Sequence, residues 1–89
     1  METYGIALFY NTKDAMQAEA EAKRRQLKAR IVPTPGKIYA SCGFSLRYDL
    51  EEEAALTAML AQCGLSCESL YHAVRDGLKV SYEKPGGGA

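Results

Sequence analysis

The feature that most constrains this chain is the stretch from residue 32 to residue 48, where two prolines end one expected strand and another begins just after a cysteine. Pro33 and Pro35 fix the backbone φ angle and remove two amide donors, so this part of the chain cannot form a central strand. Small residues surround Cys42. The stretch therefore predicts a rigid entry into a loop that displays a thiol, or only a tight loop around a buried cysteine.

The length of the chain predicts one domain. Of its 89 residues, 47% are apolar and 25% are charged, which are values typical of a globular protein. We expect a single domain over residues 1–83 and a flexible tail over residues 84–89, because the glycine-rich end has nothing to bury. A core of this size is modest, so a homodimer would add stability.

The net charge and the cysteine count limit the partners and the cellular compartment that we expect. The formal net charge is zero, which argues against nucleic acid or an anionic membrane as the main partner, since both attract a basic surface. No apolar run is long enough to span a membrane, and the first residues lack a secretion signal. Three cysteines do not suit a secreted disulfide framework. We therefore expect a cytoplasmic protein with free thiols.

Two segments have the apolar spacing of a helix. The first is expected to begin near Thr12, after a polar break that can cap a helix, and to end near Gln26, although local helix propensity alone would extend it to Ala29. The second is expected to begin after Asp49 as N-cap and to stop at Gly64. The apolar positions are Ala15, Ala18 and Ala22 in the first helix, and Leu56, Met59, Leu60 and Cys63 in the second.

Alternating or continuous apolar residues predict strands at Tyr4–Tyr10, Lys28–Pro33, Phe44–Tyr48, Leu70–Val74 and Leu78–Tyr82. Asp76-Gly77 is a strong hairpin signal between the last two strands. This order predicts an α+β protein with a ferredoxin-like βαββαβ arrangement, in which two helices cover one face of an antiparallel sheet, plus a C-terminal edge strand. That fold hosts unrelated functions, so the function must be argued from individual residues.

Cys42 is the main candidate for chemistry. A thiolate is a nucleophile, and nearby cations or convergent backbone N–H groups favour its formation. The turn Ser41-Cys42-Gly43 could supply such N–H groups, while Lys37 and Arg47 lie close enough in sequence to add positive charge. The alternative is a small buried cysteine that fills a loop core. Three aromatic residues around the thiol could line a surface for a partner or simply pack in the sheet: Tyr39, Phe44 and Tyr48.

The other thiols and the single histidine are weaker candidates. Cys63 completes the apolar stripe of the second helix, so a core thiol is expected there. Cys67 follows Gly64 in a connection that should be exposed, from which it could resolve an oxidised Cys42. His72 lies among apolar residues of a strand, which favours a structural role. A zinc site of three cysteines and His72 has little support from the spacing, and we predict no metal.

Several short motifs occur in order along the chain. They are Phe9 with Thr12, Asp14 and Ala15, then Pro33-Thr34-Pro35, then Ser41-Cys42-Gly43 with Leu46-Arg47. Each motif alone is weak, but their order and spacing are more specific. With them, the chain resembles the selenium/sulfur carrier-like proteins, a small family also known as a domain of unknown function, over roughly residues 4–74.

This resemblance implies that Cys42 carries sulfur or selenium, as a persulfide or a selenosulfide, and passes it to an acceptor enzyme. The donor would be a cysteine desulfurase or a selenium-delivery protein. Lys37, Arg47 and the amides of Ser41–Gly43 would stabilise the terminal anion. Such a protein turns over nothing alone, so we expect a carrier rather than a stand-alone enzyme, with no cofactor.

The chain departs from the family pattern in two respects. Gly36 stands where a basic residue is expected, which leaves Lys37 as the nearby cation. Cys63, Cys67 and the hairpin at Asp76-Gly77 look like additions. An alternative function therefore stays open, in which the domain is a regulatory or protein-interaction module and Cys42 is structural.

Overall fold

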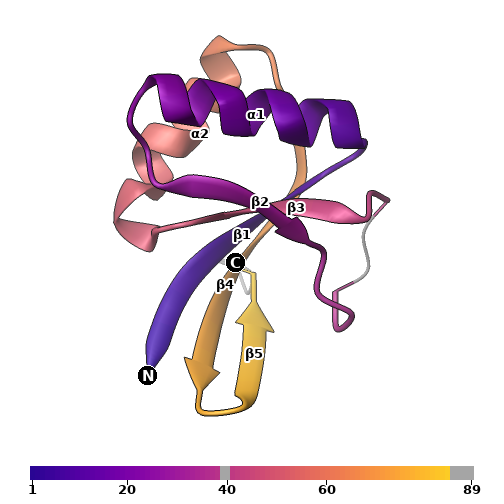
Figure 1. Ribbon diagram of the computed structural model, residues 1–89, viewed down its shortest axis with the longest axis vertical. Helices are drawn as coiled ribbons and strands as arrows, with labels where there is room; N and C mark the ends of the chain where they lie inside the picture. The colour runs from indigo at the N-terminus through magenta and orange to yellow at the C-terminus, as the bar shows by residue number, and fades with distance from the viewer. Residues whose placement is uncertain (39–40, 85–89) are drawn as a thin grey trace.

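A five-stranded antiparallel sheet and two α-helices make up the fold in the computed structural model, which describes residues 1–38 and 41–84 (Figure 1). The elements are β1 (Glu2–Phe9), α1 (Thr12–Arg24), β2 (Ala29–Pro33), β3 (Phe44–Tyr48), the 3-10 helix η1 (Leu50–Glu52), α2 (Glu53–Gln62), β4 (Cys67–Asp76) and β5 (Lys79–Glu83). The predicted α+β class is confirmed. Tyr39 and all but the first residue of the expected tail lie outside the described residues.

The strand β1 lies at the centre of the sheet. The strand order is β2-β3-β1-β4-β5, and each neighbouring pair is antiparallel. Residues 4–9 of β1 are all buried, which agrees with the nearly continuous apolar run expected for a strand covered on both faces. As the prolines predicted, β2 is an edge strand, and Pro33 forms its last position.

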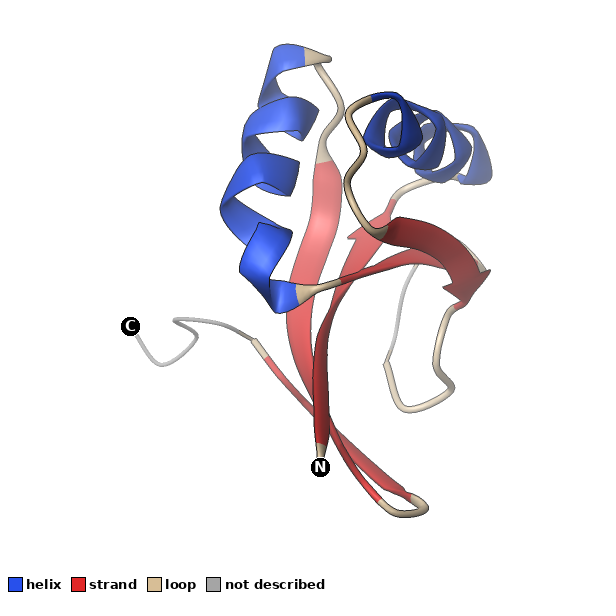
Figure 2. Ribbon diagram, turned by 60° about the vertical axis from the view of Figure 1, so that its left-hand side comes forward, coloured by secondary structure: helices blue, strands red, loops and turns tan. Residues whose placement is uncertain are grey.

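Both helices pack against one face of the sheet and share one core. That core contains Ala7 and Phe9 from β1, Leu46 and Tyr48 from β3, Ala15, Ala18 and Ala22 from α1, and Leu56, Met59 and Leu60 from α2. The three alanines are fully buried, so α1 approaches the sheet closely. The helices cover one end of the sheet, whereas the β4–β5 hairpin extends beyond them (Figures 1 and 2).

The opposite face carries a smaller core. Tyr4, Ile6 and Leu8 of β1 pack there with Ala73 of β4 and with Ile38 from the connection between β2 and β3. The neighbouring Lys37 donates a hydrogen bond from Nζ to the carbonyl of Val80 on β5, at 3.0 Å. This part of the connection therefore folds over the helix-free face, where Ile38 packs in the core and Lys37 is hydrogen-bonded to β5.

The helix boundaries agree with the predicted ones except at the start of α2. Gln26 has a φ of +61°, just after the C-cap of α1, which confirms the predicted break. Gly64 has a φ of +68° and follows α2 as predicted. Asp49 instead caps the 3-10 helix η1 without a side-chain hydrogen bond, and α2 begins at Glu53. Within the described residues, none of the helices is long and apolar enough to span a membrane.

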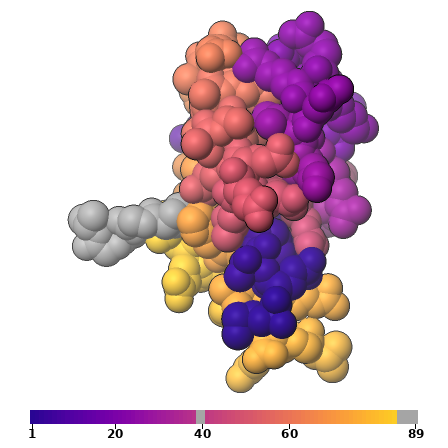
Figure 3. Space-filling view, turned by 90° about the vertical axis from the view of Figure 1, so that its left-hand side faces the viewer, coloured from indigo at the N-terminus to yellow at the C-terminus, as the bar shows by residue number. Residues whose placement is uncertain are grey.

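The hairpin predicted at Asp76-Gly77 is confirmed, with a shift of one residue. Asp76 pairs with Lys79, so the two loop residues are Gly77 and Leu78. Gly77, with a φ of +64°, is the first of them. Figure 3 shows the start of β1 emerging between the helical layer and this hairpin.

Gly5 makes room for the ring of Tyr48. It lies opposite Tyr48 on β3 and opposite His72 on β4, and a Cβ on Gly5 would clash with the Tyr48 ring. The Tyr48 hydroxyl donates to Oε1 of Glu53 at 2.6 Å, and Nε2 of His72 lies 2.7 Å from the same oxygen. Glu53, the first residue of α2, is thereby tied to β3 and β4.

These contacts shift the pKa of two groups. Burial, followed by the hydrogen bond to Glu53, raises the pKa of the Tyr48 hydroxyl. Burial alone would raise the pKa of the Glu53 carboxyl, but the hydrogen bonds from Tyr48 and His72 and the charge of His72 outweigh it. The pKa of Glu53 is therefore lowered from its ordinary value of 4.5.

We expect Gly5→Ala to destabilise the protein by about 1–3 kcal/mol, because the new methyl group overpacks the site beneath Tyr48. Urea unfolding measures this loss. In a Tyr48→Leu background the same change should cost less than half as much. Gly36→Ala, where a Cβ meets open space, is the control and should change stability by at most about 0.5 kcal/mol. An equal cost of Gly5→Ala in both backgrounds would contradict this explanation.

We expect Glu53→Gln to lower stability by about 1 kcal/mol at pH 7, because the charged acceptor of two partly exposed hydrogen bonds is lost. Since the folded-state pKa of Glu53 is lowered, its contribution is present above about pH 4.5 and is lost as the pH falls through the folded-state value. Urea unfolding at pH 7 and pH 3 should show the difference from wild type shrinking at pH 3. Glu51→Gln, at an exposed position, is the control. A difference that stays constant between the two pH values would argue against this role.

Candidate functional site

The sulfur of Cys42 lies at the N-terminal end of α1. Its Sγ is 3.4 Å from the hydroxyl of Thr12, the first residue of α1, and accepts the backbone N–H of Phe44, also at 3.4 Å. Asn11 caps the helix by accepting the N–H of Asp14 at 2.8 Å. A helix N-terminus favours negative charge. The sulfur therefore lies where a hydroxyl, an amide and a helix dipole can stabilise an anion.

Thr34 holds the turn Ser41-Cys42-Gly43, called the cysteine turn below, from the side of β2. Its backbone N–H donates to the carbonyl of Gly43 at 2.9 Å, and its hydroxyl donates to the carbonyl of Cys42 at 3.0 Å. The same hydroxyl lies 2.6 Å from that of the fully buried Ser45. Because a hydroxyl has one proton, Ser45 donates to Thr34 in this arrangement. The segment Pro33-Thr34-Pro35 thus fixes the backbone of Cys42.

Glu68 holds the turn from the side of β4. Its Oε1 accepts the backbone N–H of Ser41 and its Oε2 accepts the Ser41 hydroxyl, both at 3.0 Å. The predicted role of the Ser41 amide as a donor to sulfur therefore differs from the structure, where this amide is bound to a carboxylate. The amide that reaches the sulfur belongs to Phe44.

The two predicted cations have other partners. Lys37 donates to Val80, and Arg47 forms an ion pair with Glu2 at 2.8 Å and lies over the ring of Tyr4, 3.8 Å from its centroid. The prediction for these two cations relied on closeness in sequence. Successive side chains of a strand point to opposite faces of the sheet, so a residue near Cys42 in sequence need not lie near its sulfur.

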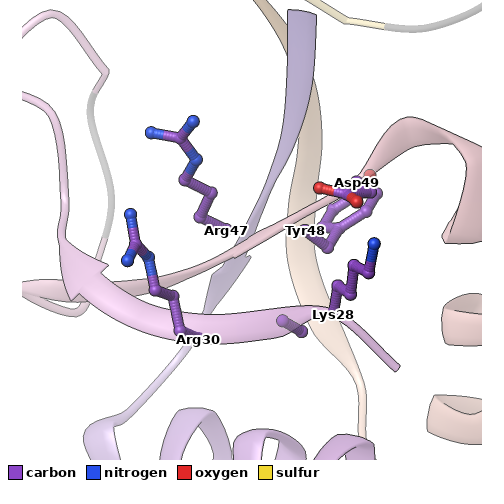
Figure 4. Close-up of a pocket in the computed structure, with 6 residues that line it drawn as sticks. Lys28, Arg30, Arg47, Tyr48 and Asp49 are labelled. Atoms are coloured by element: carbon purple, nitrogen blue, oxygen red, sulfur yellow. The ribbon is translucent and has the colours of Figure 1, made fainter. Parts of the chain in front are cut away.

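Arg47 belongs instead to a basic hollow beside β2 and β3 (Figure 4). The hollow has a volume of about 290 Å³ and is lined by Lys28, Ala29, Arg30, Arg47, Tyr48 and Asp49. Arg30 lies directly opposite Arg47 in the sheet register. The figure shows both guanidinium groups extending from neighbouring strands.

Cys42 is buried rather than exposed to solvent. Only 6% of its surface is exposed. Phe44 and Tyr10 leave large parts of their rings exposed, 43% and 55%, whereas Tyr48 is buried in the core. Of the three aromatic residues that could either line a partner surface or pack in the sheet, Phe44 is exposed, Tyr48 packs in the core, and Tyr39 lies outside the described residues.

The other thiols lie in the folded body of the protein, and all three cysteines are free. Cys63 is half-buried at the end of α2 and packs against the helix-side core, close to the prediction. Cys67 was expected in an exposed connection, but it begins β4, packs against the same core, and has its pKa raised by burial. His72 binds Glu53. Among the residues that the structure describes, no cluster of His, Cys, Asp or Glu could hold a metal ion.

Some residues of the site had no clear signal in the sequence. A Cβ on Gly43 would meet nothing within 4 Å, so no close approach of another group requires a glycine there. The contacts that matter come from Thr12, Thr34 and Glu68. Thr12 and Thr34 occur in the motifs, but only the fold shows that both meet Cys42. Glu68 belongs to no motif.

We expect Thr34→Val to destabilise the protein by about 1–3 kcal/mol, because it leaves the buried Ser45 hydroxyl and the Cys42 carbonyl without a partner. Urea unfolding of Thr34→Val, Ser45→Ala and the double variant tests this. The double variant should be less destabilised than the sum of the single ones, since both members of the hydroxyl pair are then apolar. Strict additivity would show that the two hydroxyls act independently.

Comparison with known proteins identifies the family. The model of the family described as "Putative Se/S carrier protein-like" matches residues 4–72, a range that includes Cys42. An uncharacterized protein of Methanocaldococcus jannaschii is 38% identical over 53 residues, which make up 60% of this chain. The match covers 26% of that relative, so the chain spans about a quarter of its length. No solved structure matches the chain. Because the family model matches most of its length, the chain belongs to the Se/S carrier protein-like family.

Proposed function

We propose that the protein carries sulfur or selenium on Cys42, as a persulfide or a selenosulfide, and passes it to an acceptor enzyme. The observation that supports this most directly is the placement of Sγ at the N-terminus of α1, with Thr12 and the Phe44 amide around it. Membership of the Se/S carrier protein-like family supports the same function.

Loading is a thiol exchange. The Cys42 thiolate attacks the outer sulfur of a persulfide on the donor, a new S–S bond forms at Cys42, and the donor's own S–S bond breaks to leave its thiolate. No external oxidant or reductant is needed, because the transferred sulfur keeps its oxidation state. Loading of selenium follows the same scheme: the Cys42 thiolate attacks the outer selenium of a donor selenosulfide, an S–Se bond forms at Cys42, and the donor's S–Se bond breaks to leave its thiolate. Unloading is the reverse step with an acceptor thiol.

The site suits the anion that loading creates. A persulfide places its terminal sulfur about 2 Å beyond Sγ. A terminal anion there is stabilised by donors rather than by a resident cation, since Lys37 and Arg47 are bound elsewhere. Release to an acceptor is easier when no fixed positive charge holds the cargo.

The partners are a donor, such as a cysteine desulfurase or a selenium-delivery protein, and an acceptor enzyme. The exposed rings of Tyr10 and Phe44 flank the two segments that contact the sulfur, so they are suited to receive a partner. Free thiols of this kind suit a reducing cytoplasm. We also infer a ferredoxin-like arrangement for β1 to β4, since each helix connects two strands that have one other strand between them.

A second function is favoured by one observation. Cys42 is nearly fully buried, as expected for a structural thiol in a regulatory or protein-interaction module. In that case the sulfur contacts with Thr12 and Phe44 would serve only to pack the loop.

We expect the protein to gain one sulfur atom when it is incubated with a cysteine desulfurase and cysteine, and to lose it on reduction. Intact mass spectrometry measures the gain. The Cys42→Ser variant should gain nothing, whereas Cys63→Ser and Cys67→Ser should load as the wild type does. Loading that persists in Cys42→Ser would move the site to another thiol. No loading of the wild type would favour the interaction module.

A further inference from the structure

Glu68 is brought to the cysteine turn by an irregularity in β4. Leu8 pairs with Ser69, but the next residue of β1, Phe9, pairs with Cys67. Glu68 is therefore the extra residue of a β-bulge. A bulge interrupts the alternation of side chains and redirects one of them. Here the redirected side chain is the carboxylate that binds Ser41.

The contact between Glu68 and Ser41 uses every donor of Ser41. Both carboxylate oxygens are engaged, one by the backbone N–H and one by the hydroxyl, each at 3.0 Å. Hydrogen bonds to an ionised group are stronger than neutral ones, and two of them fix an orientation. The residue next to Cys42 is thus held by a charged partner that lies 27 residues further along the chain.

The cysteine turn is therefore held on both sides. Glu68 holds Ser41 from β4, and Thr34 holds the carbonyls of Cys42 and Gly43 from β2. Between these two attachments the sulfur lies against Thr12, with little exposure. A partner can react with Sγ of Cys42 only when more of this sulfur is exposed than in this arrangement. Thr34 and Glu68 are both partly exposed, but the hydrogen bonds from Ser41 to Glu68 are exposed, whereas the one from the Thr34 hydroxyl to the Cys42 carbonyl is partly buried.

We propose that Glu68 is a positioning residue for Cys42, whose carboxylate holds Ser41 so that the thiol stays folded against Thr12. Loss of this contact lets the turn open and the thiol react. The inference deepens the proposed carrier function, since it concerns access to the same sulfur. It is tested without any donor enzyme, so its failure is distinct from the failure of the carrier function.

The test measures the rate at which iodoacetamide alkylates each cysteine of the full chain, with the label located by peptide mass spectrometry. The variants are Glu68→Ala, which removes both acceptors, and Glu68→Gln, which keeps one oxygen and the shape of the side chain. Glu51→Ala, at an exposed position of η1, is the matched control. Cys63 of the same molecules, at the end of α2 and away from the bulge, reports general unfolding.

We expect Glu68→Ala to speed the alkylation of Cys42 roughly five- to tenfold, because labelling proceeds through a minor open state whose population rises. Glu68→Gln should lie between Glu68→Ala and wild type. Glu51→Ala should match wild type, and the rate at Cys63 should not change.

Two results would overturn the proposal. One is an unchanged rate at Cys42 in Glu68→Ala. The other is an equal acceleration of Cys42 and Cys63, which would show that Glu68 stabilises the whole fold rather than the turn. Sulfur loading of wild type, measured separately, decides the carrier function whichever way the alkylation rates fall.

Discussion

The fold depends on the burial of β1 on both faces. One face carries the core shared with the two helices, and the other carries the core closed by Ile38 from the connection between β2 and β3. This double burial demands a small residue at Gly5, where the ring of Tyr48 covers the strand. The cysteine site is assembled where strands end, from segments that the pairing of β1 with β3 and β4 and of β2 with β3 brings together.

Hydrogen bonds and a helix terminus, rather than paired charges, shape the surroundings of Cys42. Thr12 and the Phe44 amide contact the sulfur, and Thr34 binds the backbone of the turn. The cations nearest in sequence are bound to Val80 and Glu2. A site of this kind can stabilise an anion without holding it strongly, which is compatible with the proposed carrier function.

Two glutamates tie other elements to β4, and only one of them contacts the cysteine turn. Glu53 joins the start of α2 to Tyr48 and His72, so it supports the fold. Glu68 is displaced by a bulge and reaches Ser41, so it acts on the turn that carries the thiol. The same residue type thus has a structural role in one place and a positioning role in the other, because the strand register gives each a different neighbour.

The sequence by itself determined the features that depend on local order along the chain. Apolar spacing predicted the strands and helices, Gly64 marked the end of α2, and the motifs around Cys42 indicated the family. Tertiary structure decided the rest. The bulge moved Cys67 into β4 and turned Glu68 toward Ser41, and the facing of the strands directed Arg47 to Glu2. These outcomes depend on which backbone positions become neighbours across the sheet, and a shift of one residue in that pairing changes the face on which each side chain lies.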